Sequence, residues 1–349
     1  MKKDNPFTLT FGKKPNRYIN RYESTNDIIS TFEAHNPISQ TYLISGIRGS
    51  GKTVLMTSVA NQLRLSSEWI VLDLNATQPL LSEFAMRLID ACKHLPNLFE
   101  KEFEISIAGI GFGMNGNPLE RDSVSIIESI TEKLKKKNKK ILITIDEVVA
   151  DDNMRTFASQ FQIFIRKEYP LFLLMTGLYE NIYAIQNDPV LTFLLRAPKI
   201  TLGALGLNQI KSEYLDIFDI DEKKANLMAN QTMGYAFAFQ ALGMLYWEYH
   251  DVLSDKEIIR KLDGMLEDFV YRKIWSSLSN AEKQIVLAMP FHNEKMKVKD
   301  LCNRLNMKSA TFSKYRERLL NKGVLFSPEY GYLRIALPRF SDIVHIYDM

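Results

Sequence analysis

Apolar residues in the first half of the chain form short continuous runs separated by stretches with helical spacing. The runs at 41–46, 69–75, 140–148 and 171–178 have the length of strands. Continuous apolar runs are typical of strands buried on both faces of a parallel sheet. Between them, apolar residues recur at helical spacing, for example at Val54, Leu55, Val59 and Leu63. The pattern predicts an α/β domain over residues 41–205, with helices on both faces of a parallel sheet.

The next segment, residues 206–277, contains no strand-like run. Its apolar positions follow a helical period instead. They include Ala225, Leu227, Met228, Phe237, Phe239, Leu242, Leu245 and Trp247. We therefore expect a helical subdomain after the α/β domain.

The last segment, residues 278–349, alternates three short amphipathic stretches with turn residues. Ser279 is a candidate N-cap for the first predicted helix, and Gly323 ends the third. The sequence VLFSPEYGYLRIAL then predicts a pair of short strands around a turn. Three helices and a hairpin in this order predict a winged helix-turn-helix.

Charge is distributed unevenly between these segments. The 349 residues carry a net charge of only +3, yet residues 280–340 contain twelve Lys/Arg and five Asp/Glu. The rest of the chain is therefore slightly acidic, and the positive charge is concentrated in the predicted C-terminal domain. Such a local basic patch is the electrostatic signature of a nucleic-acid partner.

The cysteines and the lengths of the apolar runs indicate in which compartment the protein lies and which sites it lacks. The two cysteines, Cys92 and Cys302, are far apart and have no Cys or His at metal-ligand spacing, so neither a disulfide framework nor a zinc site is indicated. No apolar run approaches the roughly 20 residues of a membrane-spanning helix, and residues 1–40 have no apolar run typical of a secretory signal. We expect a cytoplasmic protein that does not span a membrane.

The stretch GIRGSGKTV matches the phosphate-binding pattern G-x-x-x-x-G-K-[ST] between a predicted strand and a predicted helix. Its backbone N–H groups would cradle phosphate oxygens, and the start of the helix favours negative charge. Lys52 is expected to reach the β- and γ-phosphates of ATP, and Thr53 to ligate Mg²⁺. The candidate nucleotide-binding residues are Gly46, Ile47, Arg48, Gly49, Ser50, Gly51, Lys52, Thr53 and Val54.

Two adjacent carboxylates follow the predicted strand ILITI. Asp146 at this strand end is a candidate second metal ligand with Thr53, and Glu147 is a candidate general base for an attacking water. A base beside the metal ligand favours ATP hydrolysis over phosphoryl transfer to a small acceptor. The pattern predicts an ATPase that uses Mg²⁺.

Two further polar residues have alternative interpretations. Thr176 ends the next predicted strand, where it would either face the γ-phosphate or cap the strand. Arg196 precedes another short strand, where it would either reach phosphate in an adjacent subunit or pair with a surface acid. Both are retained as candidate catalytic residues.

The third C-terminal helix carries the candidate DNA contacts. Lysines, arginines and hydroxyl side chains near its start are suited to phosphates and base edges in a major groove. These residues are Lys308, Ser309, Thr311, Ser313, Lys314, Arg316 and Arg318. The alternative is a protein-binding module, and the local positive charge favours double-stranded DNA.

The order of these features resembles the AAA+/STAND branch of P-loop ATPases, in particular archaeal-type and origin-recognition-like ATPases. The phosphate-binding stretch, the IDE triplet and the arginine before ITLGAL occur in the order of that branch. QTMGYAFAFQ is similar to its Gly-x-Pro lid motif, with Ala236 in place of the proline, and Asn20 and Arg21 are similar to its N-terminal Gly-Arg turn. The resemblance covers the chain from about Asn5 onward.

The resemblance implies that residues 206–277 form a lid over the nucleotide and that Arg21 contributes to nucleotide binding. It also implies that phosphate state is converted into domain motion. Residues 1–40 are interpreted as an N-terminal segment. The leading hypothesis is an ATPase whose nucleotide state controls a DNA-binding winged helix. Such an ATPase could also form a homo-oligomer or bind a protein partner. A signalling switch that uses the winged helix for protein contacts is the second hypothesis, and a small-molecule kinase is the third.

Overall fold

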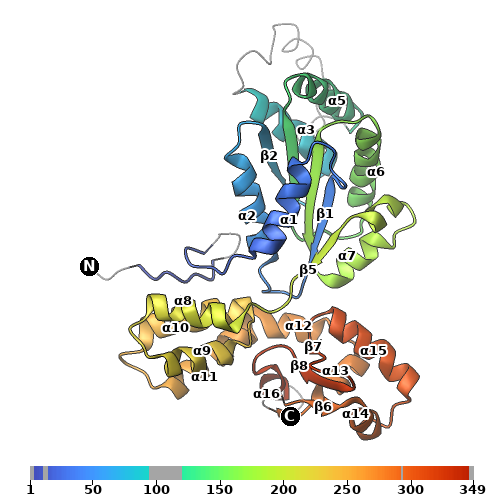
Figure 1. Cartoon of the computed structure of the whole chain (residues 1–349). Coiled ribbons are helices and arrows are strands. Elements are labelled where there is room, and N and C mark those ends of the chain that lie inside the picture. The colour runs from blue at the N-terminus through green and yellow to red at the C-terminus, as the bar shows by residue number, and fades with distance from the viewer. Residues whose placement is uncertain (1–3, 11–14, 94–119, 292–293, 346–349) are drawn as a thin grey trace. The chain divides into compact units, whose positions relative to one another are not determined.

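The computed structural model describes residues 4–10, 15–93, 120–291 and 294–345. The chain forms two units by its internal contacts. One unit contains residues 21–45 and 52–201, and the other contains residues 1–20, 46–51 and 202–349. Figure 1 shows the elements of both units.

The first unit is built on a five-stranded parallel sheet. Its strands are β1 (Thr41–Ser45), β2 (Trp69–Leu74), β3 (Lys140–Ile145), β4 (Leu171–Gly177) and β5 (Lys199–Thr201). Their order is β2-β3-β4-β1-β5, so β4 lies between β1 and β3. The central strands β1 and β4 are buried along their whole length, as their continuous apolar sequence requires. The predicted parallel sheet and its four long strands are confirmed.

Helices cover both faces of this sheet because successive side chains of each strand point to opposite sides. On one face, Phe32 of α1 (Tyr22–Glu33) packs against Tyr42 and Phe172, beside α2 (Lys52–Arg64). On the other face, Ile141 and Ile143 belong to a core shared with three helices. These are α3 (Leu80–Lys93), α5 (Glu120–Lys136) and α6 (Asp152–Arg166). The helix α7 (Tyr179–Gln186) and the short 3₁₀ helix η1 (Thr192–Arg196) lead into β5.

The second unit contains the predicted helical subdomain. Its helices are α8 (Leu207–Ile217), α9 (Glu222–Thr232), α10 (Ala236–Tyr249) and α11 (Asp255–Leu266). Phe7, from the N-terminal segment, packs against the rings of Tyr214, Phe218 and Phe239. A π-helical turn, η2 (Glu267–Tyr271), and α12 (Arg272–Ser276) continue from α11. The absence of strands over 207–277 is confirmed.

In the described part of residues 278–349, the elements are four helices and three short strands. They are α13 (Asn280–Leu287), β6 (Met296–Lys297), α14 (Val298–Arg304), α15 (Ser309–Asn321), β7 (Leu325–Phe326), β8 (Tyr332–Ile335) and α16 (Phe340–Val344). Ser279 caps α13 by accepting from the backbone N–H of Glu282, as predicted. The strands β7 and β8 pair antiparallel, and β6 joins them as a third strand that the sequence did not reveal. Residues 206–277 and 278–349 lie in the same one of the two units, so the domain boundary predicted between them stays a prediction.

Candidate functional site

The segment Gly46–Gly51 connects β1 to α2, as the phosphate-binding pattern requires. Gly49 and Gly51 have positive φ angles of 75° and 92°, which residues other than glycine rarely adopt. The backbone N–H of Ser50 donates to the carbonyl of Ile47 at 3.2 Å, so the segment makes a tight turn. The glycines therefore permit the turn that the motif predicts.

Asp146 is the centre of a hydrogen-bonded group at the carboxyl end of the sheet. The Thr53 hydroxyl, in the first turn of α2, donates to Asp146 Oδ2 at 2.7 Å. The buried Thr176 hydroxyl donates to Asp146 Oδ1. Because β4 lies beside β3, the sheet register brings the end of β4 next to the residue that follows β3. Three of the predicted site residues are thereby brought together.

Glu147 follows Asp146 in a left-handed backbone conformation, with φ of 54°. Its N–H donates to Asp146 Oδ1 at 3.0 Å, and its side chain is exposed. A left-handed conformation costs a residue other than glycine on the order of 1 kcal/mol, and it persists only where surrounding structure holds it. Here the bonds to Asp146 and Thr176 hold it.

The donor set around Asp146 fits Mg²⁺. A hydroxyl oxygen of Thr53 and a carboxylate oxygen of Asp146 are hard ligands, and their 2.7 Å separation lets both reach one ion. Mg²⁺ is commonly held by one or two such groups together with substrate phosphates. Among the described residues, no cluster of three or more His, Cys, Asp or Glu side chains could hold a metal by itself. The chemistry of the group therefore suits a metal shared with a phosphate ligand.

The other predicted nucleotide-site residues occupy different environments. Lys52 begins α2 and is 9% exposed, and Val54 is half-buried in the same turn. Arg21 is half-buried at the N-cap of α1, where burial lowers its pKa. Arg196 is exposed at the end of η1, before the amino end of β5, whereas Asp146 follows the carboxyl end of β3. The structure does not bring Arg196 to the Asp146 group of its own chain.

Both cysteines are buried and free. Burial raises the pKa of the Cys92 thiol to about 12. A thiol of such high pKa is protonated at neutral pH and is a poor nucleophile or metal ligand.

The helix α15 presents its predicted DNA contacts to solvent. Phe312 and Leu319 are fully buried and fix one side of the helix to the core. The side chains of Lys308, Ser309, Thr311, Ser313, Lys314 and Arg318 are exposed, and Arg316 is half-buried. The Arg318 guanidinium lies 5.9 Å from the centre of the Tyr315 ring. This exposed face is polar and carries most of the predicted contacts.

Two residues that the sequence analysis did not select bind the phosphate-binding segment directly. The Tyr235 hydroxyl donates to the Arg48 carbonyl at 2.6 Å, and the Phe237 N–H donates to the Gly49 carbonyl at 3.1 Å. Both residues lie in the stretch GYAFAFQ, whose similarity to a lid motif was the available signal. The similarity does not identify which residues of this stretch make the contact.

Solved structures similar to this chain include a Walker-type ATPase, an ORC2 protein and Cdc6p. The Walker-type ATPase of Pyrococcus abyssi aligns over 95% of this chain and 96% of its own, with a TM-score of 0.62 and 13% identity. The Aeropyrum pernix ORC2 protein, solved as ADPNP-ADP complexes, aligns over 97% and 96%, with a TM-score of 0.59 and 16% identity. Cdc6p of Pyrobaculum aerophilum aligns over 97% and 96%, with a TM-score of 0.51 and 14% identity. The chain has the fold of these P-loop ATPases along nearly its whole length.

Sequence comparisons add one match. A domain of unknown function, DUF8462, matches residues 268–344, from η2 to the end of α16. No curated protein matches the chain. Within the described part of the chain, every helix is too short or too polar to cross a membrane.

Proposed function

We propose that the protein is a cytoplasmic ATPase that binds ATP with Mg²⁺ and hydrolyses it. The observation that carries this proposal is the hydrogen-bonded group of Thr53, Asp146 and Thr176, in which Thr53 is the last residue of a complete phosphate-binding motif. The fold shared with a Walker-type ATPase and with an ORC2 protein solved as ADPNP-ADP complexes supports it.

Each polar group of the site has a role in this proposal. Lys52 binds the β- and γ-phosphates, and Thr53 and Asp146 hold Mg²⁺, which when bound neutralises charge on the phosphate oxygens. Thr176 keeps the Asp146 carboxylate oriented and lies beside the strand of the phosphate-binding segment. Glu147 accepts a proton from the attacking water, for which its exposed carboxylate suits it. Arg196 acts on the site of an adjacent subunit in a homo-oligomer.

We further propose that residues 278–349 form a winged helix that binds double-stranded DNA. The elements α13, α14 and α15 with the strands β6, β7 and β8 have the order of that motif. The exposed polar face of α15 would enter the major groove, and residues 206–277 would act as a nucleotide-dependent lid. In this scheme, nucleotide state controls how α15 is presented.

The test is a pair of titrations on the full chain. Fluorescent ADP should bind the wild-type protein, and Lys52→Ala should weaken this binding by about 3 kcal/mol, roughly 150-fold, because charged hydrogen bonds to phosphate are lost. Retained affinity in Lys52→Ala would contradict the site assignment. An unchanged thermal melting curve is the control for folding.

The second titration measures the fluorescence anisotropy of labelled duplex DNA at two salt concentrations, with ATP, ADP or no nucleotide. We expect binding that weakens steeply with salt, because phosphate contacts release counterions, and that changes with nucleotide. Absence of DNA binding in every state would favour the second hypothesis, a signalling switch whose winged helix binds a protein. The exposed Phe326 and Tyr330 on and beside β7 are the observation that keeps this alternative open.

A further inference from the structure

The N-cap residue and the first turn of α10 make two hydrogen bonds to consecutive carbonyls of the phosphate-binding segment. Tyr235 donates its hydroxyl to Arg48, and Phe237 donates its N–H to Gly49. Tyr235 is 5% exposed, and burial raises its pKa, so the hydroxyl stays protonated and remains a donor. The segment is thus held from its carbonyl side by the helix that the sequence assigns to the lid.

Gly49 is adapted to this contact. The pattern G-x-x-x-x-G-K-[ST] permits any residue at position 49, yet a Cβ there would clash with the Tyr235 hydroxyl. The positive φ of Gly49 adds a second reason for glycine at this position. The absence of a side chain at position 49 therefore allows the Tyr235 hydroxyl to reach the backbone.

The bond to Arg48 also determines where a phosphate-binding donor points. A trans peptide is planar, so its N–H is directed opposite to its C=O. Fixing the Arg48 carbonyl therefore fixes the N–H of Gly49, which belongs to the same peptide. Backbone N–H groups of this segment are the donors by which such a motif holds phosphate.

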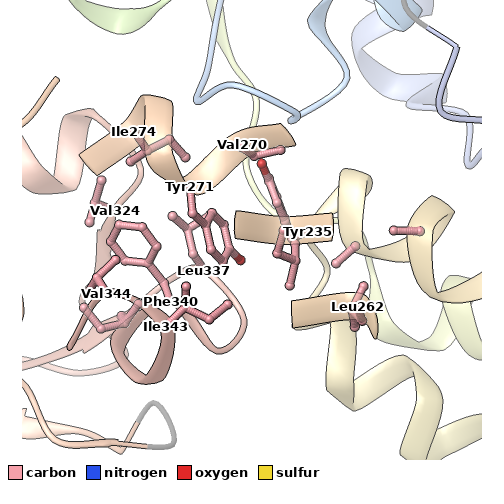
Figure 2. Packing of buried hydrophobic residues seen from close by; sticks show 14 of the residues in the cluster. Tyr235, Leu262, Val270, Tyr271, Ile274, Val324, Leu337, Phe340, Ile343 and Val344 are labelled. Carbon is pink, nitrogen blue, oxygen red and sulfur yellow. The ribbon is translucent and has the colours of Figure 1, made fainter. Parts of the chain in front are cut away.

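The ring of Tyr235 connects this contact to the C-terminal elements. It stacks on Tyr271 of η2, with ring centres 6.4 Å apart and planes inclined by 23°. Tyr271 in turn packs edge-on against Phe340 of α16, with centres 4.9 Å apart, and donates its hydroxyl to the Pro338 carbonyl at 2.6 Å. Figure 2 shows Tyr235 and Tyr271 neighbouring each other, with Phe340 and Leu337 beyond Tyr271.

The connection passes through a π-helical turn that ends at Tyr271. Such turns are rare, and they frequently occur at functional sites. The residues before Phe340 are held to α11 by an ion pair between Arg339 and Asp263, whose Nη2 and Oδ2 atoms are 2.7 Å apart. A displacement of Tyr235 would therefore act through Tyr271 on the segment around Phe340, which this ion pair holds to α11.

We propose that Tyr235 is a positioning residue that orients the phosphate-binding segment and transmits nucleotide occupancy to residues 337–344. The inference rests on the proposed nucleotide site and adds a regulatory link to it. The group that makes the bond to Arg48 is the Tyr235 hydroxyl. The test therefore removes this hydroxyl and keeps the aromatic ring.

The experiment compares Tyr235→Phe with Tyr271→Phe in the full chain. Both variants remove a buried hydroxyl that donates to a carbonyl at 2.6 Å, but only Tyr235 donates to the phosphate-binding segment. We expect Tyr235→Phe to bind fluorescent ADP about tenfold more weakly, the effect of one net hydrogen bond, and Tyr271→Phe to stay within about twofold of wild type. Equal affinity in the two variants would assign Tyr235 a structural role only and overturn the inference.

Hydrogen exchange supplies a readout that is independent of affinity. In the nucleotide-free protein, Tyr235→Phe should exchange faster over residues 46–51 than Tyr271→Phe, because the segment loses its anchor. ADP should change the exchange of residues 337–344 in the wild type and leave it unchanged in Tyr235→Phe. An ADP effect on 337–344 that survives in Tyr235→Phe would overturn the link.

The two proposals fail in different ways. A wild-type protein without affinity for ADP would overturn the proposed function and the positioning role with it. If wild type and Tyr235→Phe bind ADP equally well, the proposed function stands and only the positioning role of Tyr235 is overturned.

Discussion

The Asp146 group and the outer face of α15 are built in opposite ways. At the end of the sheet, Thr53, Asp146 and Thr176 bond to one another, and Thr176 is fully buried. On α15, most predicted contacts are exposed side chains on a helix held by Phe312 and Leu319. A substitution in the first region therefore alters stability and chemistry together, whereas a charge on α15 can be removed at little cost to folding.

Within α15 and its end, two lysines show the same contrast. Lys314 is exposed, whereas Lys322 follows the helix and forms an ion pair with Glu282 at 3.1 Å, with side chains 13% and 3% exposed. Burial raises the pKa of Glu282, but bonds from Ser279 and Lys322 outweigh it and leave the pKa below its usual value. The role of a lysine near this helix therefore cannot be assigned from its charge alone; the burial of its side chain must also be known.

The largest effect expected from this comparison concerns Glu147. Glu147→Gln should retain ATP affinity and hydrolyse ATP about 100-fold more slowly, because the amide cannot accept the proton of water. Phosphate release and ATP titration measure the two quantities. Glu168→Gln is the matched control, since Glu168 is also exposed with a positive φ of 56° but lies after α6, away from the motif. Unchanged hydrolysis in Glu147→Gln would remove this residue as the base.

An intermediate effect is expected at the buried ion pair. Lys322→Ala should lower the free energy of unfolding by about 2 kcal/mol at pH 7, because it leaves the Glu282 carboxylate buried with fewer partners. A carboxyl whose folded pKa is depressed stabilises the fold above its unfolded pKa and loses this contribution as pH falls. The difference from wild type should therefore shrink below about pH 4 in urea unfolding curves.

Lys314→Ala is the control for this experiment, with a change in unfolding free energy within about 0.5 kcal/mol. A loss of stability as large as that of Lys322→Ala would contradict the distinction between a buried and an exposed lysine on this helix.

The smallest effect is expected when two exposed charges are removed. Lys314→Ala combined with Arg318→Ala should weaken duplex DNA binding about tenfold and lower the slope of log affinity against log salt by about two. Anisotropy titrations at several salt concentrations measure both, with the melting curve unchanged. Full DNA affinity in the double variant would contradict the assignment of the DNA contacts to α15. A Lys283→Ala variant, which removes a single positive charge in α13 over the Trp275 ring, is the comparison for a loss of charge outside α15.

Much of the architecture follows from local pattern. Continuous apolar runs identified the four long strands, because a strand buried on both faces has no polar side to show. The serine at 279 and the glycine at 323 marked helix ends through local capping and a positive φ of 74°. The two-residue strand β6 was not found, since a segment that short has no period to detect.

Local sequence pattern was sufficient to identify the phosphate-binding motif and the residues Thr53 and Asp146, because each lies beside a recognisable strand or helix. The meeting of Thr53, Asp146 and Thr176 in one hydrogen-bonded group became evident from the folded chain, since their distance depends on the order of strands in the sheet. The folded chain also revealed the contact between Tyr235 and Arg48, residues 187 positions apart. Motifs report local backbone geometry, whereas such contacts depend on how distant elements pack, which no local pattern encodes.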